Sequence, residues 1–320
     1  MNKISKDLLE KINTIPAQPG VYEMLDLNGR IIYIGKSISL RNRVKSYFVK
    51  KPKWSKVEKM ISFINDIEYI VTDTHLEAVL LECELIKKIK PMFNTQLKND
   101  ERYAYIKVED YNIHKSLSMI SKREENSFGP FRRKFFLLEL LNSLKNIYPV
   151  IKTHEGYDFQ YNLIPITMNR KLFEENKNSL QEIFLYDKSM VLFINRLEDK
   201  MKEAASKLQY VTASIYRDMI YGFNYLKTGL YGYKTMFFKD ILLKMPIDTG
   251  YKLFFVSKGE ILSKSTFPVL KEKDIENFIN AGKNLSLSNS LDRNEKANID
   301  FRDILYSEIN SLPEEMVIYL

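Results

Sequence analysis

The chain has 320 residues, a net charge of +8 and a single cysteine, Cys83. One cysteine excludes internal disulfides and any zinc or iron–sulfur site built from cysteine ligands. No apolar run approaches the roughly 18 residues that a membrane helix needs, and residues 1–10 lack the apolar core of a signal peptide. These features predict a cytoplasmic protein without a membrane partner.

The positive charge is concentrated in the first half of the chain. Residues 1–150 carry 26 Lys and Arg against 18 Asp and Glu, whereas the remainder carries 23 of each kind. Basic residues are densest between Arg41 and Lys59, where aromatic side chains are interleaved with them. Such a surface neutralises phosphates and releases counterions, which favours nucleic-acid contact over an ordinary solvated helix and loop. The candidate DNA-binding residues here are Arg41, Lys45, Lys50, Lys51 and Lys53.

An Asn-Gly pair at residues 28–29 separates two apolar alternating runs, 20–25 and 30–34, and predicts a β-hairpin. The register expected from a two-residue turn pairs Leu27 with Arg30, Met24 with Tyr33 and Tyr22 with Gly35. Residues two apart in a strand share a face, so two phenols come together beside a glycine that lets a ligand approach the backbone. Lys36 follows at once, and the arrangement suits phosphate chemistry.

Helices and strands alternate unevenly after the hairpin. The patterns predict helices at 40–48 and 56–64, a strand at 67–72, a helix from a capping box at Thr74 to Lys90, strands at 103–108 and 117–120, and a helix at 132–146. Residues 147–188 are irregular and polar, which is typical of a linker, and residues 189–228 predict a helical hairpin. Strands at 252–256 and 260–263 and helices near 272–281 and 301–309 follow. This mixture predicts an α+β fold.

Glu82 lies on the apolar face of the predicted 74–90 helix, four residues after Ala78 and four before Ile86. An isolated buried charge is costly, so this carboxylate needs a partner. A divalent cation would supply one. A buried salt bridge, or a place at the edge of the apolar face, would satisfy the same pattern.

Arg43 and Tyr47 are four residues apart on the predicted 40–48 helix and therefore share a face. Phosphodiester cleavage requires neutralisation of the charge that builds on the phosphate, which an arginine and a divalent ion can provide. A tyrosine acts as a general base only if its pKa, ordinarily ~10, is lowered. Lys36, Arg43 and a metal ion would favour that change, and core packing is the alternative role for each aromatic residue.

The remaining polar candidates give weaker signals. Asn94 follows Pro91 and by itself predicts a turn residue. The three histidines, His75, His114 and His154, lack the spacing of metal ligands and are expected on the surface.

The order of these residues resembles that of the UvrC family, whose N-terminal domain is a GIY-YIG endonuclease. The matching segments are Ile15–Tyr22, Tyr33–Lys36, Leu40–Phe48, Ile67–Thr74, Glu77–Cys83, Leu85–Lys88, Lys90–Asn94, Tyr105–Lys107 and Phe128–Phe131. The resemblance covers residues 1–150 nearly end to end. It implies a domain that cuts DNA on the 3′ side of a lesion with one divalent metal ion, Mg²⁺ or Mn²⁺.

The resemblance also implies a role for each site residue. Glu82 would be the sole protein ligand of the metal, Tyr33 the general base, Lys36 the residue that tunes it, and Arg43 the residue that stabilises the scissile phosphate. Gly35 would keep the site open. The supporting active-site residues would be Tyr22, Tyr47 and Asn94.

The helical hairpin at 194–226 resembles the UVR motif, by which UvrC docks on UvrB. The matches are Leu197–Ala205, Leu208–Tyr210 and Tyr216–Ile220, whereas Val211–Ser214 departs from the family's charged pair and two alanines. The resemblance implies UvrB as a partner, and an ordinary packed hairpin is the alternative. The implied contact residues are Leu197, Met201, Ala205, Leu208, Tyr210, Arg217 and Asp218.

Two departures narrow the resemblance. Residues 150–185 contain no cysteine, so the iron–sulfur cluster of UvrC is not expected. The chain also stops too soon for the RNase H-like nuclease and helix–hairpin–helix unit that end UvrC. We therefore expect a GIY-YIG domain with a mainly antiparallel sheet and flanking helices at 1–100, a connecting region without iron–sulfur cysteines at 101–188, a UVR-like hairpin at 189–228, and a small mixed α/β region of unknown role at 229–320.

The expected function is a single 3′-side incision at damaged DNA in nucleotide excision repair. One alternative is an adaptor that binds DNA and UvrB without cutting. Another is a structure-specific nuclease that acts without UvrB.

Overall fold

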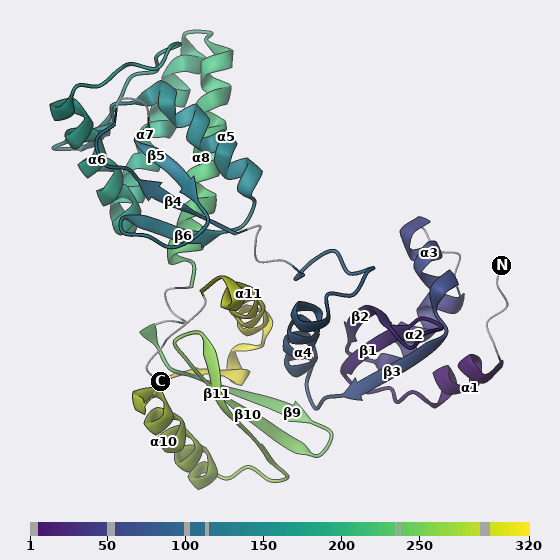
Figure 1. Ribbon diagram of the computed structural model, residues 1–320. Coiled ribbons are helices and arrows are strands. Elements are labelled where there is room, and N and C mark those ends of the chain that lie inside the picture. Colours follow the sequence, from purple (N-terminus) through teal and green to yellow (C-terminus); the bar gives the residue numbers. More distant parts are fainter. Residues whose placement is uncertain are drawn as a thin grey trace. The chain divides into compact units, whose positions relative to one another are not determined.

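The computed structural model describes residues 6–49, 55–98, 103–112, 115–233, 236, 238–288 and 295–320 (Figure 1). The chain forms two compact units, one made of Met1–Asp100 with Thr235–Leu320 and the other of Glu101–Lys234. Helices mixed with antiparallel sheets confirm the predicted α+β class. In the described part of the chain, no helix combines the length and the apolar character needed to span a membrane.

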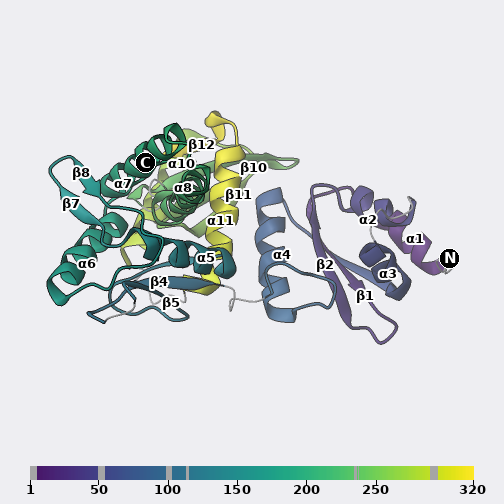
Figure 2. The same ribbon diagram turned by 90° about the horizontal axis from the view of Figure 1, so that it is seen from above.

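A three-stranded antiparallel sheet of order β2-β1-β3 organises the N-terminal part of the first unit. Its strands are β1 (Gly20–Leu25), β2 (Ile31–Ser37) and β3 (Asp66–Val71). One face packs against α1 (Lys6–Thr14), α2 (Leu40–Val49) and α3 (Ser55–Phe63), and the opposite face packs against α4 (His75–Ile89). Figures 1 and 2 show this order of layers.

The hairpin has the predicted strand register but a different turn. Tyr22 pairs with Gly35 and Met24 with Tyr33, as expected from the sequence. The prediction that Leu27 pairs with Arg30 is wrong, because Asp26 donates its N–H to the Arg30 carbonyl across a three-residue loop. The Asp26 carboxylate also accepts the N–H groups of Asn28 and Arg30, each at 2.9 Å, which stabilises the longer loop. A register shift after Met24 restores the expected pairing further along the strands.

Helix α4 begins and ends as the sequence predicts. The Glu77 N–H donates to Thr74 Oγ1 at 3.2 Å, which is the N-cap half of the predicted capping box, and the Thr74 hydroxyl donates to a Glu77 carboxylate oxygen at 3.2 Å. At the other end Lys90 adopts a left-handed conformation and donates its N–H to the Ile86 carbonyl. Ala78 and Ile86 are buried against Val21 and Ile34 of the sheet.

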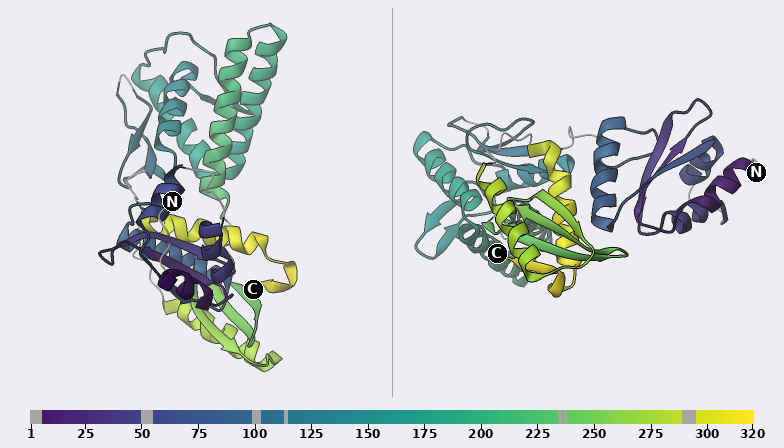
Figure 3. Two further views of the ribbon diagram at one scale, coloured as in Figure 1. Left: turned by 90° about the vertical axis from the view of Figure 1, so that its right-hand side faces the viewer. Right: turned by 90° about the horizontal axis from the view of Figure 1, so that it is seen from below.

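The C-terminal part of the first unit is a four-stranded antiparallel sheet of order β11-β10-β9-β12 (Figure 3). It comprises β9 (Ile241–Ile247), β10 (Gly250–Ser257), β11 (Glu260–Phe267) and β12 (Val317–Tyr319), with α10 (Glu272–Ser288), α11 (Glu295–Ser311) and the short 3-10 helix Glu314–Met316. Phe278 of α10 packs on Phe255 of the sheet, and α11 contacts both α4 and β11. The sequence patterns identify β10, β11 and both α-helices but not β9 and β12.

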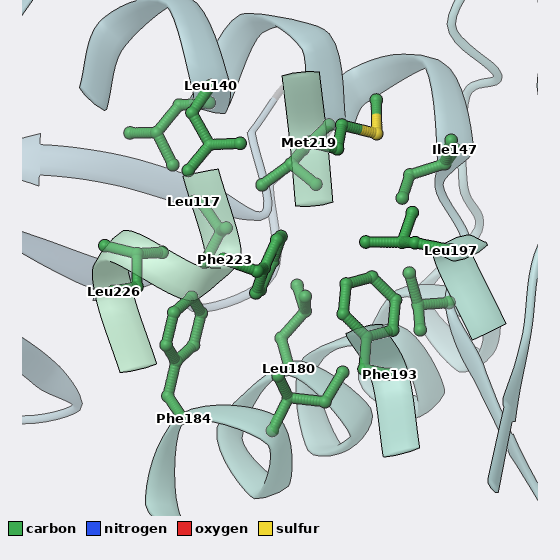
Figure 4. Packing of buried hydrophobic residues seen from close by; sticks show 14 of the residues in the cluster. Leu117, Leu140, Ile147, Leu180, Phe184, Phe193, Leu197, Met219, Phe223 and Leu226 are labelled. Carbon is green, nitrogen blue, oxygen red and sulfur yellow. The ribbon is translucent and has the colours of Figure 1, made fainter. Parts of the chain in front are cut away.

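The second unit has one large core. A sheet of order β5-β4-β6 and a two-stranded β7-β8 ribbon pack with four α-helices around Phe184, Phe193 and Phe223 (Figure 4). Its elements are β4 (Ala104–Val108), β5 (Leu117–Ile120), β6 (Ser127–Phe131), α5 (Lys134–Leu144), the 3-10 helix Lys145–Ile147, β7 (Ile151–Thr153), β8 (Gly156–Asp158), α6 (Arg170–Leu185), α7 (Asp187–Ser206) and α8 (Tyr210–Tyr231).

The predicted linker at 147–188 is wrong, because this stretch holds β7, β8 and α6. Helix α6 buries Phe173 and Leu180, so it belongs to a core. A buried polar residue on the same face interrupts its apolar pattern. Asn176 accepts the Val150 N–H at 2.7 Å and donates to Ser116 Oγ at 2.8 Å, and these long-range bonds satisfy its amide inside the unit.

Candidate active site

Three tyrosines and an arginine gather on the sheet face that packs against α2. The hydroxyls of Tyr22 and Tyr47 lie 2.8 Å apart, and the Tyr33 ring centroid is 6.1 Å from that of Tyr22 and 6.4 Å from that of Tyr47. The guanidinium carbon of Arg43 lies 5.2 Å from the Tyr47 ring centroid. Tyr22 is fully buried, whereas Tyr33 and Tyr47 are partly exposed. The fold thus brings together four predicted site residues from β1, β2 and α2.

Gly35 makes room for the Tyr22 phenol. The two residues are paired across the hairpin, and a Cβ at Gly35 would lie 2.3 Å from the Tyr22 hydroxyl oxygen. Gly35 is itself buried, so its missing side chain serves the packing of Tyr22 rather than an open backbone surface. The glycine is therefore required by the ring opposite it.

Glu82 reaches the end of β2 from helix α4. Its Oε1 accepts the Lys36 backbone N–H at 3.1 Å. Burial is the largest influence on the pKa of Glu82 and raises it, whereas the Lys36 N–H and the charges of Lys36, His75 and Arg43 oppose that rise. The net pKa stays above its ordinary value, so the carboxylate lacks a full counter-charge within the protein.

This environment fits a divalent cation. Mg²⁺ is commonly bound by one or two carboxylates, with water and substrate phosphate as the other ligands. Among the residues that the structure describes, no group of three or more His, Cys, Asp and Glu side chains is placed to hold a metal. A cation at this site would therefore use Glu82 as its protein ligand, and its charge would stabilise the ionised carboxylate.

The pKa of Tyr33 lies far above its ordinary value in the protein alone. Burial is the largest cause, followed by the neighbouring Tyr47 and the charge of Glu82. The sequence-based expectation of a lowered pKa is thus not met in the absence of a cation. Neutralisation of Glu82 would remove one of the three causes.

Asn94 holds β2 from its open edge. Its Nδ2 donates to the Ile34 carbonyl at 2.8 Å, and its Oδ1 accepts the Ile34 N–H at 3.0 Å. The neighbouring Phe93 N–H donates to the Ile32 carbonyl at 2.9 Å. Because β2 is an edge strand, these bonds satisfy backbone groups that the sheet leaves unpaired. The buried amide thus positions the strand that carries Tyr33, Gly35 and Lys36.

The structure describes two of the predicted DNA-binding residues near α2, Arg41 and Lys45. Arg41 is partly buried and donates Nε–H to the Ile15 carbonyl at 2.6 Å, so one donor of its guanidinium serves the fold. Lys45 is partly exposed on α2. The predicted residues Lys50, Lys51 and Lys53 lie outside the described residues.

His75 joins the site, and it lies only partly at the surface. Its Nε2 lies 3.1 Å from Lys36 Nζ, its Nδ1 lies 3.3 Å from an oxygen of Glu308, and its side chain is 27% exposed. His154 is exposed as expected, and His114 lies outside the described residues. His75 precedes Glu82 by seven residues, or two helical turns, and this shared face is the signal that could have identified it.

In the second unit, α7 and α8 form the predicted helical hairpin. Leu208 and Tyr210 beside the turn are 71% and 67% exposed. Leu197 is fully buried in the core, so it offers no surface to a partner (Figure 4). Of the other predicted contact residues, Met201 is partly exposed and three are exposed, namely Ala205, Arg217 and Asp218.

Comparison with known proteins agrees with this architecture. Residues 18–95 match the family model described as the UvrC-like GIY-YIG domain, and residues 192–220 match the UvrB/uvrC motif. UvrABC system protein C of Thermoanaerobacter sp. strain X514 is 37% identical over 229 residues, which cover 66% of this chain and 37% of that protein. The Alkaliphilus oremlandii protein of the same name is 32% identical over 335 residues, which cover 98% of this chain and 51% of that protein.

The chain therefore spans about half or less of the length of these relatives. A crystal structure of the GIY-YIG N-terminal endonuclease domain of UvrC from Thermotoga maritima, bound to its catalytic cation magnesium, is 37% identical. The match covers 28% of this chain and 99% of that one, with a TM-score of 0.27. With a UvrC-like GIY-YIG domain near its N-terminus and a UvrB/uvrC motif in its second unit, the chain belongs to the UvrC family.

Proposed function

We propose that the chain is a metal-dependent DNA endonuclease that makes a single incision on the 3′ side of a lesion during nucleotide excision repair. The observation that carries this proposal is the proximity of two sets of groups along β2, because the charge of Glu82 raises the pKa of Tyr33 and the charge of Arg43 opposes the rise in the pKa of Glu82. The tyrosine cluster with Arg43 approaches from one side, and Glu82 with Lys36 approaches from the other. The polarity of the incision comes from the family resemblance.

A divalent ion, Mg²⁺ or Mn²⁺, would be held by Glu82 and would supply Lewis-acid stabilisation of the phosphate charge. Arg43, fixed over the Tyr47 ring, adds a permanent positive charge beside the phosphate. The attacking water forms the new P–O bond as the bond to the leaving oxygen breaks. Tyr33 is the group that takes the water's proton, and the Tyr22–Tyr47 hydrogen bond orients the phenols around it.

The proposed protein partner is UvrB, bound through the hairpin of α7 and α8. Leu208 and Tyr210 present exposed apolar surface beside the turn, where a partner would bury it. Arg217 and Asp218 are exposed and paired with each other at 3.0 Å, so they can exchange this contact for one with UvrB.

The decisive experiment is a reconstituted incision assay with a lesion-bearing duplex, Mg²⁺ or Mn²⁺, and UvrA with or without UvrB. We expect Glu82→Gln to abolish nicking while DNA binding persists. Glu84→Gln is the matched control, because Glu84 is exposed on the same helix. Undiminished nicking by Glu82→Gln would contradict the site assignment.

The same assay separates the two alternatives. Binding of DNA and UvrB by the wild-type protein, without a nick under any condition, would indicate an adaptor. Cleavage of branched DNA without UvrB would indicate a structure-specific nuclease.

A further inference from the structure

The C-terminal part of the first unit is joined to the helix that carries Glu82. Lys87 near the end of α4 pairs with Asp300 near the start of α11 at 2.8 Å, and both side chains are largely buried. His75 at the start of α4 contacts Glu308 near the end of α11. The two helices therefore lie antiparallel, with one polar link close to each end.

Strands β10 and β11 add a second set of links to the start of α4. Lys252 contacts Asp73 at 2.5 Å and Glu77 at 2.8 Å, and Lys264 contacts Glu77 at 2.7 Å. These ion pairs are independent of His75. The contact between His75 and Glu308 is thus one of several that hold the C-terminal part in place, and through His75 it continues to Lys36 in the nuclease site.

Lys36 is held at both ends. Its backbone N–H donates to Glu82, and its ammonium donates to His75 Nε2 at 3.1 Å. A free lysine side chain loses rotamer entropy when it is fixed. An anchor that exists before the reaction removes that cost from the catalytic step.

A single protonation form of His75 satisfies both of its neighbours. The Lys36 ammonium can only donate, so Nε2 must carry its lone pair, and the ring proton then lies on Nδ1. From Nδ1 it points to the carboxylate of Glu308, at 3.3 Å. The pKa of Glu308 lies below its ordinary value, and the hydrogen bond from His75 is the largest cause. The charged carboxylate in turn favours the imidazole with its proton on Nδ1.

We propose that His75 and Glu308 are positioning residues for Lys36, so that the C-terminal part of the first unit completes the nuclease site. The inference rests on the proposed function, in which Lys36 tunes Tyr33. It assigns a role to a region, residues 236–320, for which the sequence suggested none. Removal of the partners that orient metal ligands commonly changes activity by about 10- to 100-fold, and we expect a loss at the lower end of that range for the partners that orient Lys36.

The first test reads His75 directly and needs no activity. In long-range ¹H–¹⁵N spectra of histidine-labelled full-length protein at pH 8, the chain's three histidines give few signals, and His75→Gln assigns the one of interest. We expect His75 as the Nδ1-protonated tautomer. Glu308→Ala should shift its Nδ1 signal, and Lys36→Met its Nε2 signal. The proposal would be overturned if His75 were protonated on Nε2, or if its ring nitrogen signals stayed unchanged in both Glu308→Ala and Lys36→Met.

The second test measures single-turnover nicking at saturating DNA. His75→Ala and Glu308→Ala should each slow it about tenfold without changing the DNA dissociation constant. The double variant should be no slower than the slower single variant, because both act through Lys36. His75→Gln should keep most of the rate, since its amide has an N–H that can donate to Glu308 and an oxygen that can accept from Lys36.

The matched control is Lys264→Ala, which removes an ion pair between the same two regions without touching His75. Nicking by this variant at the wild-type rate supports the positioning role. An equal loss in Lys264→Ala, or additive losses in the double variant, would overturn it in favour of simple docking. If the wild-type protein does not nick, the proposed function fails, and the spectra still decide whether His75 connects Glu308 to Lys36.

Discussion

The two faces of the N-terminal sheet contribute different chemistry to the site, and they are built in different ways. The face toward α2 supplies phenols and a guanidinium from the hairpin and the helix directly after it. The face toward α4 supplies a carboxylate, an ammonium and an imidazole. The first set comes from one short stretch of chain, between Tyr22 and Tyr47, whereas the second depends on contacts from Glu82 and Glu308, which lie much further along the chain. The phenols and the guanidinium on the face toward α2 (the phenol side) are thus placed by local sequence, whereas the charged groups on the face toward α4 are placed by tertiary packing.

After the loss expected for Glu82→Gln, the largest effect should come from removing Tyr33, the proposed base among the phenols. Tyr33→Phe should lower the nicking rate by about 10² or more, because general base catalysis contributes at least that factor. Unfolding monitored by circular dichroism should change little. Tyr69→Phe on β3, with its exposed side chain, is the control. A nicking rate near that of the wild-type protein would remove Tyr33 from the mechanism.

The next largest loss of nicking should come from removing Asn94, whose amide supports β2 at its open edge. Asn94→Ala leaves the N–H and C=O of Ile34 without their partner, which should cost about 2 kcal/mol of unfolding free energy and reduce nicking. Urea denaturation measures the unfolding free energy, and the incision assay measures the nicking rate. Met92→Ala is the matched control, since Met92 is 63% exposed on the same loop. An unchanged unfolding free energy in Asn94→Ala would show that the Asn94 amide does not stabilise β2.

The contacts from the C-terminal sheet should show a pH dependence. Burial acts to raise the pKa of Glu77, but the hydrogen bonds from Lys252 and Lys264 outweigh it, so the net pKa lies below the ordinary 4.5. A lowered pKa means that the stabilisation is complete above pH 4.5 and is lost as the pH falls through the folded-state value. Glu77→Gln should therefore lower the melting temperature at pH 7 and flatten its decline in acid. A variant whose melting temperature follows the wild-type curve at every pH would contradict this account.

The smallest effect should come from the hydrogen bond within the phenol cluster. Tyr22→Phe removes one hydroxyl from the Tyr22–Tyr47 pair, which should cost about 1 kcal/mol and slow nicking less than Tyr33→Phe. Tyr47→Phe removes the same bond from the other side. The double variant should therefore lose less than the sum of the two single variants, and strict additivity would show that the two hydroxyls act separately.

The sequence patterns predict most of the phenol side. The Asn-Gly pair and the alternation around it give the pairing of Tyr22 with Gly35, although the turn is one residue longer because Asp26 accepts two backbone N–H groups. Helical spacing places Glu82 on the face of α4 toward the sheet. Periodicity does not show which groups a polar side chain contacts. The contacts of His75 with Lys36 and Glu308 therefore cannot be predicted from it. Nor does it identify a buried helix whose face carries a polar residue, so the sequence predicts a linker where α6 with Asn176 lies.

The sequence by itself determined the α+β class, the strand register of the hairpin, the order of the candidate site residues and the family. These features depend on short-range spacing, which strand and helix periods translate directly into shared faces. Only the tertiary structure decided that Gly35 lies under the Tyr22 ring, that Asn94 closes the edge of β2, and that Glu308 reaches Lys36 through His75. Each of these contacts depends on where a distant segment packs, and the packing of the whole core sets that position rather than any local pattern.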